Sequence, residues 1–404
     1  MSKKTKNEIQ KEAVEAIKDH NGKGLVLVAT GVGKSKIGID WIKKYLDFCF
    51  NGVYGTSKVK DRYNFLIVVP TRELQKNTWK KEFELWGATD IYDKHITVVC
   101  YASLNKYQHE NFDVVILDEC QNITPNNSAF FDNNICKSVI GLTATYPRDL
   151  IKRNLLTKIG LEIIYKIDFD EAVEWGLVSP YQIQVITVPL EDRVETVKAG
   201  SKDKPFMTTE YANYHYITAQ IHDIEKRNQM LAQMLWSKDD LHRIKMLRLK
   251  RMNMFKNSYT KSKVARYLLR NVIPKEQRTI IFAGSIEQAN ALCDYRYHSK
   301  SSNADFELFM QEKLTNISCV DKVNEGVNIP NLDCALIAQL NSNELDLIQR
   351  MGRIVRYREG HVGTVYIIVI ENTVDFEWFK LATKNLDESN ITYTPYSKLK
   401  ELYD

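Results

Sequence analysis

Two short polar segments in the first third of the sequence carry residues that could act together on a phosphate group. The first reads Gly-Val-Gly-Lys-Ser, in which Gly31 and Gly33 precede Lys34 and Ser35. Glycines let backbone N–H groups crowd around phosphate, the lysine supplies a charge for terminal phosphates, and the serine oxygen can bind Mg²⁺. The strict phosphate-loop pattern has a glycine where this chain has Val28. The match is therefore to the end of the motif, and a coincidental loop is the alternative.

The second segment is a pair of adjacent acids, Asp118 and Glu119, which follows the apolar residues 114–117. Acids at the carboxyl end of a buried strand lie where open α/β sheets bind their ligands. There Asp118 would hold Mg²⁺ through water, and Glu119 would orient or deprotonate an attacking water molecule. An apolar run that ends in acids is common by chance. The phosphate loop upstream, in the same expected sheet, makes the joint pattern informative.

Alternating apolar and amphipathic segments must position these residues. In the first part of the chain we expect helices at 8–18 and 34–48, and strands at 25–29, 65–69, 96–101, 114–117 and 139–142. The alternation returns later, with strands expected at 279–283, 316–320, 334–339 and 364–370, and helices at 286–294 and about 346–351. Short apolar strands separated by helices indicate parallel sheets covered on both faces. The sequence therefore predicts two α/β domains.

A polar, mostly helical stretch at about 191–268 lies between these two parts. Its end, 241–263, contains lysines and arginines but no Asp or Glu. Such a segment could follow a phosphate backbone, and its aromatic residues could stack on bases. We select Arg248, Lys250 and Arg251 as candidate nucleic-acid contacts. The alternative is a solvated helix whose apolar side packs on the second domain.

The composition is typical of a soluble globular protein, with 404 residues, 44% hydrophobic and 26% charged. No apolar run reaches membrane-spanning length, and the basic N-terminus has no apolar segment behind it, so we expect neither a membrane span nor a secretory signal. Seven scattered cysteines without a C-x-x-C pair indicate neither a disulfide framework nor a zinc site. We expect a reducing, cytoplasmic location. A net charge of +5 is too small to establish a polyanionic partner.

Eight segments resemble, in order, the motifs of superfamily 2 DExH-type helicases and together span nearly the whole chain. The first part resembles motif I (29–35), motif Ia (69–75), the short motif that follows it (100–104), the DExH box (118–121) and motif III (142–145). The second part resembles motif IV (279–283), motif V (324–330) and motif VI (349–356). Each motif alone is weak, but the ordered set is specific. The resemblance implies a nucleic-acid-stimulated ATPase that uses ATP and Mg²⁺.

The implied fold is α/β, with two tandem RecA-like domains, parallel sheets with helices on both faces, and a helical basic insertion. We expect the ATP-binding domain at 1–175, a linker and the helical basic segment at 176–268, the core of the second domain at 269–372, and a helical tail at 373–404.

The resemblance also implies roles for single residues. ATP would be bound by the glutamine that reads adenine, the phosphate loop and a motif V glycine: Gln10, Thr30, Gly31, Val32, Gly33, Lys34, Ser35 and Gly326. Gln10 has the alternative of being a surface residue on an amphipathic helix. Catalysis would use Lys34, Asp118, Glu119 and three motif VI residues, Gln349, Arg353 and Arg356. In the family, motif VI faces the ATP site across a cleft, where its arginines can stabilise phosphate charge.

Further roles concern nucleic acid. Contacts to it are implied for Pro70, Thr71, Arg72, Tyr101, Ser103, Ser285, Asn324 and Arg350. Coupling of hydrolysis to nucleic-acid binding is implied for Gln121, Thr143 and Thr145. Gln121 stands where the DExH box has histidine; it can still form hydrogen bonds, but it cannot titrate.

Motifs V and VI look closest to those of phage, restriction and recombination DNA helicases. We therefore expect an ATP-dependent DNA helicase or translocase that acts on single-stranded, forked or branched DNA, in the host cytoplasm if a phage encodes it. We expect a monomer that could use a protein partner for specificity. An RNA helicase and an ATP-gated nucleic-acid clamp are the alternatives.

Overall fold

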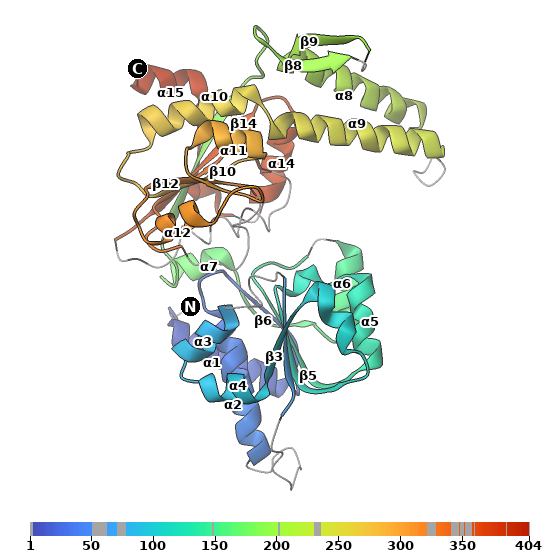
Figure 1. Ribbon diagram of the computed structural model, residues 1–404, viewed down its shortest axis with the longest axis vertical. Helices are drawn as coiled ribbons and strands as arrows, with labels where there is room; N and C mark the ends of the chain where they lie inside the picture. Colours follow the sequence, from blue (N-terminus) through green and yellow to red (C-terminus); the bar gives the residue numbers. More distant parts are fainter. Residues whose placement is uncertain are drawn as a thin grey trace. The chain divides into compact units, whose positions relative to one another are not determined.

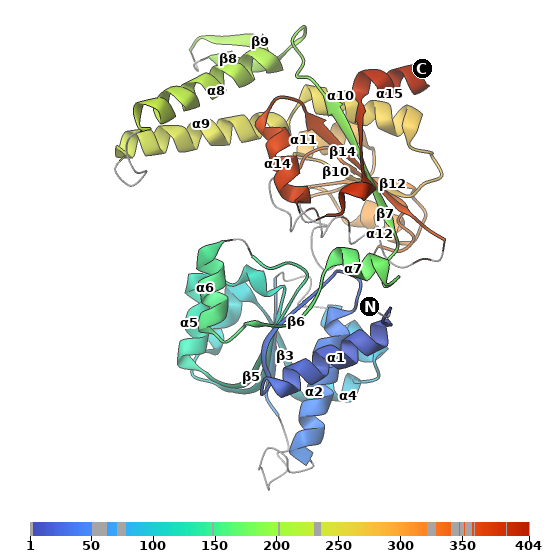
Figure 2. The ribbon, with the colours of Figure 1, turned by 180° about the vertical axis from the view of Figure 1, so that it is seen from behind.

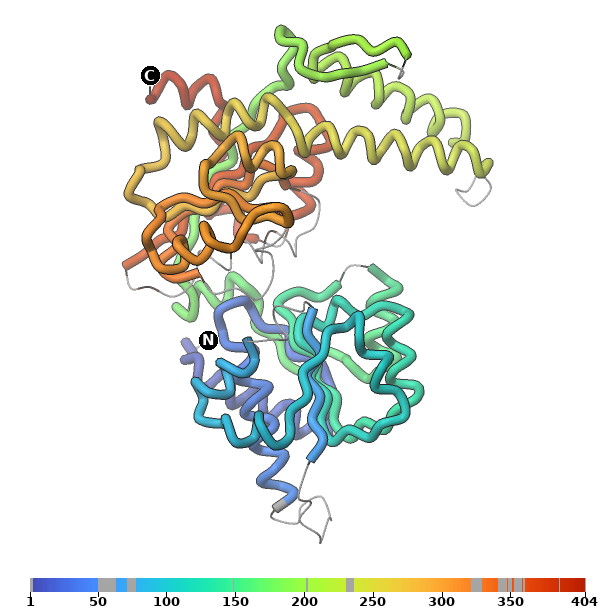
Figure 3. Tube along the Cα trace, in the orientation of Figure 1, coloured from blue at the N-terminus to red at the C-terminus, as the bar shows by residue number. Residues whose placement is uncertain are grey.

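The computed structural model describes residues 3–50, 63–70, 78–147, 149–200, 203–229, 236–320, 329–340, 347, 351, 358, 360–384 and 386–403. The chain divides into two compact units, which Figure 3 traces along the sequence. The first unit comprises Met1–Pro180 with Val355–His361, and the second comprises Tyr181–Ile354 with Val362–Asp404.

The first unit is built on a six-stranded sheet in the order β3-β2-β4-β5-β1-β6, with every pair of neighbours parallel. Its strands are β1 (Lys23–Val28), β2 (Phe65–Val69), β3 (Ile96–Cys100), β4 (Asn111–Asp118), β5 (Ile135–Thr143) and β6 (Ile163–Ile167). Its helices are α1 (Lys6–Asp19), α2 (Lys34–Phe50), α3 (Trp79–Leu85), α4 (Thr89–His95), α5 (Pro125–Asn133), α6 (Leu150–Lys158) and α7 (Phe169–Glu174), with short 3₁₀ segments η2 (Tyr101–Tyr107) and η3 (Cys120–Asn122).

Both faces of this sheet are covered because successive strand residues point to opposite sides. On β4, Val115 and Leu117 join a buried cluster with Phe130 of α5. Ile116 faces the other way, where its Cδ1 would lie 3.1 Å from a Cβ added to Gly38 of α2. Figures 1 and 2 show α1 to α4 on one side of the sheet and α5 and α6 on the other. The buried apolar runs of the sequence are the central strands of this sandwich.

The second unit has a seven-stranded parallel sheet in the order β11-β12-β10-β13-β14-β7-β15. Its strands are β7 (Tyr181–Val188), β10 (Thr279–Phe282), β11 (Arg296–Tyr297), β12 (Asn316–Cys319), β13 (Cys334–Ile337), β14 (Gly363–Ile370) and β15 (Ile391–Pro395). Its helices are α10 (Tyr259–Tyr267), α11 (Ile286–Leu292), α12 (Ala304–Met310), α14 (Val374–Thr383) and α15 (Tyr396–Tyr403), with the short segments η5 (Leu268–Val272) and η6 (Glu388–Asn390). Two parallel-sheet α/β domains, as expected from the sequence, are confirmed.

A helical arm extends from the sheet of the second unit (Figures 1 and 2). We use "arm" for the antiparallel hairpin β8 (Glu195–Gly200) and β9 (Pro205–Thr209) with helices α8 (Glu210–Arg227) and α9 (Lys238–Lys256). The two helices pack through a small core of their own, made by Ile217, Ile221 and Ile224 with Ile244 and Leu247.

Two segments differ from the expected secondary structure. The stretch 176–268 begins with β7, a strand between β14 and β15, and it contains the β8–β9 hairpin. The tail 373–404, expected to be helical, contains the edge strand β15 between α14 and α15. Both strands depend on pairing with β14 or β7, which is distant in sequence, and neither is an uninterrupted apolar run. Among the described residues, no helix is both long and apolar enough to span a membrane.

Candidate active site

The phosphate loop connects the end of β1 to the first turn of α2, which begins at Lys34. Gly31 and Gly33 have φ angles of 94° and 101°, in the region that favours glycine. A Cβ on Gly33 would lie 2.5 Å from Gln10 Nε2, so a side chain there would also clash. Thr30 Oγ1 is buried and has no hydrogen-bond partner among the described residues. A helix N-terminus beside an unpartnered hydroxyl suits an anionic ligand such as a nucleotide phosphate.

Gln10 lies against this loop. Its side chain is 5% exposed, and its Nε2 donates to the carbonyl oxygen of Val32 at 2.8 Å. Helix α1 holds it there, and α1 starts with a capping box between Thr5 and Glu8. The surface alternative for Gln10 is therefore wrong. Its reading of adenine stays a prediction.

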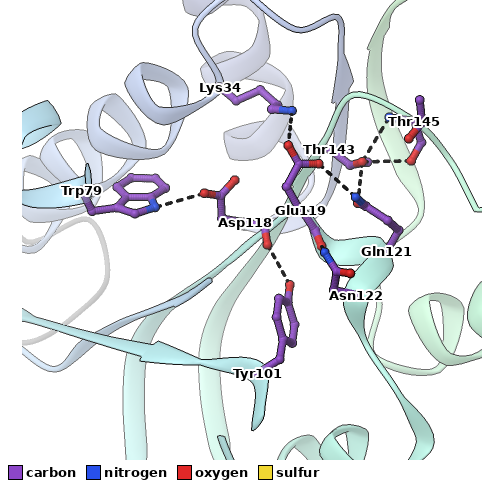
Figure 4. A network of polar contacts seen from close by, with 9 residues as sticks. All are labelled: Lys34, Trp79, Tyr101, Asp118, Glu119, Gln121, Asn122, Thr143 and Thr145. Carbon is purple, nitrogen blue, oxygen red and sulfur yellow. Dashed lines mark hydrogen bonds and ion pairs between the residues drawn. The ribbon is translucent and has the colours of Figure 1, made fainter. Parts of the chain in front are cut away.

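Asp118 is the last residue of β4, and Glu119 follows it directly. In the sheet, only β5 lies between β4 and β1. Lys34 Nζ donates to Glu119 Oε1 at 2.7 Å, so the phosphate-binding lysine and the expected catalytic base form an ion pair (Figure 4). Glu119 has φ 48° and ψ 59°, a left-handed conformation that is uncommon for a non-glycine residue. Such strain costs on the order of 1–3 kcal/mol and is concentrated at functional sites. It turns the Glu119 side chain toward the loop.

Two aromatic residues hold Asp118. Trp79 Nε1 donates to Asp118 Oδ2 at 3.1 Å, and the Tyr101 hydroxyl donates to the Asp118 backbone oxygen at 3.0 Å (Figure 4). Burial, together with the charge of Glu119, raises the pKa of Asp118 to about 7, although Lys34 and Trp79 act in the opposite direction. A carboxylate with a raised pKa beside a phosphate loop is typical of a functional site.

The three expected coupling residues form one hydrogen-bond chain that reaches the acid pair. Gln121 Nε2 donates to Glu119 Oε2 at 3.0 Å, and Thr143 Oγ1 donates to Gln121 Oε1 at 2.7 Å (Figure 4). The N–H of Thr145 donates to Thr143 Oγ1 at 3.1 Å, while Thr145 Oγ1 is buried and has no partner among the described residues. A glutamine can thus join the acid pair to the end of β5 without a titratable histidine.

A hydroxyl and a carboxylate are available for a divalent cation. Ser35 lies in the first turn of α2 and Asp118 at the end of β4. Mg²⁺ prefers hard oxygen ligands and is usually bound by one or two protein groups together with water and substrate phosphates. The described residues contain no group of three or more potential metal ligands. This donor set fits a metal that arrives with a nucleotide.

The residues of the first unit that are expected to contact nucleic acid differ in how deeply they are buried. Pro70 directly follows β2 and is partly buried, and Ser103 is partly buried within η2. Tyr101 is only 5% exposed and packs in the core, where its hydroxyl supports Asp118. The Tyr101 side chain thus supports the acid pair from within the core, and its expected contact with nucleic acid stays a prediction.

The residues of the second unit that are expected to contact nucleic acid differ in whether their side chains already have partners within the protein. Ser285 caps α11 by accepting from the N–H of Gln288. In the arm, Arg248 pairs with Glu225 at 2.8 Å, and Arg251 donates to Thr218 at 3.4 Å. The Lys250 side chain is exposed and makes no ion pair or hydrogen bond with other described residues. Of the three arm residues, Lys250 is thus the one most available to a ligand.

Eight expected site residues lie outside the described residues and stay predictions: Thr71, Arg72, Asn324, Gly326, Gln349, Arg350, Arg353 and Arg356. Conversely, sequence reasoning missed Trp79 and the supporting role of Tyr101. Nothing in the spacing of Trp79 pairs it with Asp118, because that contact depends on α3 packing beside the end of β4.

Comparison with known proteins gives matches to two family models. Residues 3–148 match the type III restriction enzyme res subunit, and residues 260–358 match the helicase conserved C-terminal domain. Residues 149–259, which include the arm, lie outside both matches.

Two curated relatives align over very different lengths. The DNA 3'-5' translocase XPB2 of Sulfurisphaera tokodaii is 22% identical over 92% of this chain and 84% of its own length. The DEAD-box ATP-dependent RNA helicase 22 of Arabidopsis thaliana is 29% identical over 24% of this chain and 19% of its own length.

Two solved structures share the fold. The ATP-dependent type ISP restriction-modification enzyme LlaBIII bound to DNA has a TM-score of 0.59 at 16% identity and covers 98% of this chain. This chain corresponds to 31% of that enzyme's length. S. cerevisiae Dbp5 bound to RNA and ADP BeF3 has a TM-score of 0.56 at 12% identity, with coverages of 98% and 91%.

Proposed function

Since this chain belongs to the superfamily 2 helicases and is a nucleic-acid-dependent ATPase, we propose that it is an ATP-dependent DNA helicase or translocase. In this proposal, ATP hydrolysis drives movement along DNA, or unwinding of it, on single-stranded, forked or branched substrates. The observation that best supports the ATPase chemistry is the ion pair between Lys34 and Glu119, which lies at the edge of the sheet that holds the phosphate loop.

In this proposal, the residues of the first unit have separate roles in ATP hydrolysis. An arriving γ-phosphate competes with Glu119 for the Lys34 ammonium, so nucleotide binding releases the Glu119 carboxylate to accept a proton from the attacking water. Gln121 holds the second oxygen of that carboxylate, and Thr143 holds Gln121. Mg²⁺, held by Ser35 and Asp118, would neutralise charge on the phosphates. We keep Arg353 and Arg356 as the groups that stabilise the γ-phosphate in the transition state.

DNA is favoured over RNA by the extent of the alignments. The DNA translocase aligns over 92% of this chain, whereas the RNA helicase aligns over 24%. An RNA helicase remains the second candidate, supported by the higher identity of that shorter match. We further propose a monomer in a reducing cytoplasm, which is consistent with seven cysteines that form no disulfide among the described residues.

The test is ATP turnover by the full chain with single-stranded DNA, duplex DNA, a fork, a four-way junction and RNA. We expect stimulation by DNA, and a loss of about 100-fold or more in Lys34→Ala, because removing one group that stabilises transition-state charge typically has that effect. If RNA stimulates ATP turnover more strongly than DNA, the substrate is RNA and not DNA. Turnover that is indifferent to every nucleic acid would refute the motor function, and DNA-stimulated turnover without movement or unwinding would favour the clamp.

A further inference from the structure

The arm contains a groove that neither family model covers. A cavity of about 910 Å³ lies between the β8–β9 hairpin and the helices α8 and α9. A second cavity of about 640 Å³ adjoins it further along the two helices, and Gln220 lines both. We call these two cavities together the arm groove. Its lining on α9 includes Leu247, Lys250 and Met254, which are spaced three and four residues apart and share one helix face.

Two exposed aromatic rings lie in the lining of the larger cavity. Tyr216 of α8 is 68% exposed and Phe206 of β9 is 57% exposed. Exposed aromatic rings beside a groove provide stacking surfaces for unpaired bases, and such stacking tolerates any base because every base has a π-face. A duplex keeps its bases stacked within the helix and would leave these rings unused.

The charge of the groove is complementary to a polyanion. The larger cavity is lined by Lys198 and Lys250, and neither side chain forms an ion pair or hydrogen bond with the described part of the chain. The acid in its lining is Glu210, which is buried and accepts from the N–H groups of Tyr259 and Thr260 at 2.7 Å and 3.1 Å. That carboxylate is therefore occupied by the protein itself and does not face a ligand as a free charge.

The smaller cavity continues this pattern. Its lining contains three cations, Lys226, Arg227 and Arg243, and one acid, Asp223. Arg243 and Lys250 are two helical turns apart on α9, roughly 10 Å along the axis at 1.5 Å per residue. Positive groups thus follow the groove over a length that can contact more than one phosphate.

We propose that the arm groove binds single-stranded nucleic acid, with bases stacked on Tyr216 and Phe206 and with phosphates beside Lys250 and Arg243. The proposal rests on the proposed function in taking nucleic acid as the ligand, and it adds the binding surface and its preference for unpaired strands. The groove is also anchored: Tyr259, in its lining, begins α10, and that helix packs in the core of the second sheet. A surface on such an element is preorganised for its ligand.

The test compares two doubly substituted full-length proteins. The groove variant carries Lys250→Glu and Tyr216→Ala. The control variant carries Lys245→Glu and Tyr211→Ala, which make the same changes on exposed positions of the same two helices, outside the lining of both cavities. Binding of fluorescein-labelled oligo(dT), oligo(rU) and a DNA duplex is measured by anisotropy over a range of salt concentrations, after circular dichroism has confirmed folding.

We expect the groove variant to bind single strands at least about tenfold more weakly, because it loses one stacking partner and one phosphate contact. The slope of log affinity against log salt should fall by about 0.7 per lost phosphate contact. The control variant should stay within about twofold of the unmodified protein. Equal losses in both variants, no loss in the groove variant, or a loss confined to the duplex would overturn the proposal. Preference for oligo(dT) or oligo(rU) identifies the strand as DNA or RNA.

A second measurement needs no substitution. Oligonucleotides carrying 5-iododeoxyuridine are photocrosslinked to the unmodified full chain, and crosslinked peptides are identified by mass spectrometry. We expect crosslinks at Tyr216 or Phe206, and crosslinks confined to other peptides would contradict the groove. Nucleic-acid-stimulated ATP turnover that Lys34→Ala abolishes, combined with intact binding by the groove variant, would refute the groove while leaving the motor in place. If the groove variant loses binding but the unmodified protein shows no nucleic-acid-stimulated ATP turnover, the groove is supported and the motor function is refuted.

Discussion

At the scale of single residues, Asp118 is held from two directions. The Trp79 indole donates to its side chain and the Tyr101 hydroxyl donates to its backbone. Trp79 follows the segment 69–75, which resembles motif Ia, and Tyr101 lies within the segment 100–104, so each one links such a segment to the expected metal site. Asp118 itself has a raised pKa, which makes its charge state sensitive to pH near neutrality.

Replacing the Trp79 donor tests its positioning role. Trp79→Phe keeps an aromatic ring but removes the hydrogen bond to Asp118, and hydrogen bonds to charged groups contribute about 1.5–3 kcal/mol. We expect the Mg²⁺ concentration for half-maximal ATP turnover to rise about tenfold. Mn²⁺ binding in the presence of ADP, followed by electron paramagnetic resonance, should weaken in parallel.

The matched control for this variant is Trp41→Phe. Trp41 is also fully buried in the first unit, and its indole donates to Ser138 Oγ at 2.9 Å, away from the acid pair. Its replacement should lower thermal stability without changing the metal dependence. If both variants change the metal dependence equally, the Trp79 effect is one of general packing.

The raised pKa of Asp118 predicts how stability depends on pH. The folded protein holds this proton up to a pKa of about 7, against an ordinary value of 3.8, so the stability from the neutral form is lost as pH rises from about 4 to about 7. Asp118→Asn cannot ionise. In the presence of EDTA, we expect it to unfold at least ~2 °C above the unmodified protein at pH 8. That advantage should shrink at pH 5, and an advantage that is constant between pH 5 and pH 8 would contradict the assignment.

At the scale of elements, a buried ion pair joins α10 to α14 in the second unit. Lys261 is fully buried, and its Nζ donates to Asp375 Oδ1 at 2.7 Å and to Gln339 Oε1 at 3.0 Å. The other Asp375 oxygen accepts from the N–H of Ile370 at the end of β14. Burial lowers the pKa of Lys261, while Asp375 acts to raise it. The pair therefore fixes the start of α10, where the arm enters the core, to the carboxyl ends of the central strands.

Breaking this pair should be costly. Lys261→Met leaves the Asp375 charge buried without its partner, and such changes cost about 3–5 kcal/mol. We expect this loss in urea denaturation, and a partial recovery in the double variant Lys261→Met with Asp375→Asn.

An exposed ion pair on α14 provides the comparison. Lys380 and Glu377 lie 3.7 Å apart with both side chains exposed. Lys380→Met should cost less than about 1 kcal/mol, because water screens such pairs. A similar small cost for Lys261→Met would show that the second unit does not depend on its buried pair.

At the scale of the whole molecule, the chemistry is divided between two units that each have a parallel sheet. The phosphate loop and acid pair belong to the first unit, and the arm groove belongs to the second. The two family models match on either side of residues 149–259. The arm therefore lies outside both matched parts of the chain.

The sequence by itself determined the local features. Buried parallel strands appear as short apolar runs, so β2 was predicted at its observed bounds and β10, β12 and β13 within two residues. Lys34, Glu119, Gln121 and Thr143 were selected from motif order, and the structure brings them together in one network. Motifs preserve such residues because their chemistry requires particular residue types at particular strand ends.

Only the tertiary structure decided the features that depend on distant partners. The Trp79 indole reaches Asp118 because of how α3 packs, and Tyr101 lies in the core and supports the site from within. Strand β7 exists as part of a sheet because β14 and β15 pair with it, and the arm groove exists because a hairpin lies beside two packed helices. Side-chain contacts and strand pairing between residues far apart in the chain leave no periodic signal in the sequence, so folding alone establishes these contacts.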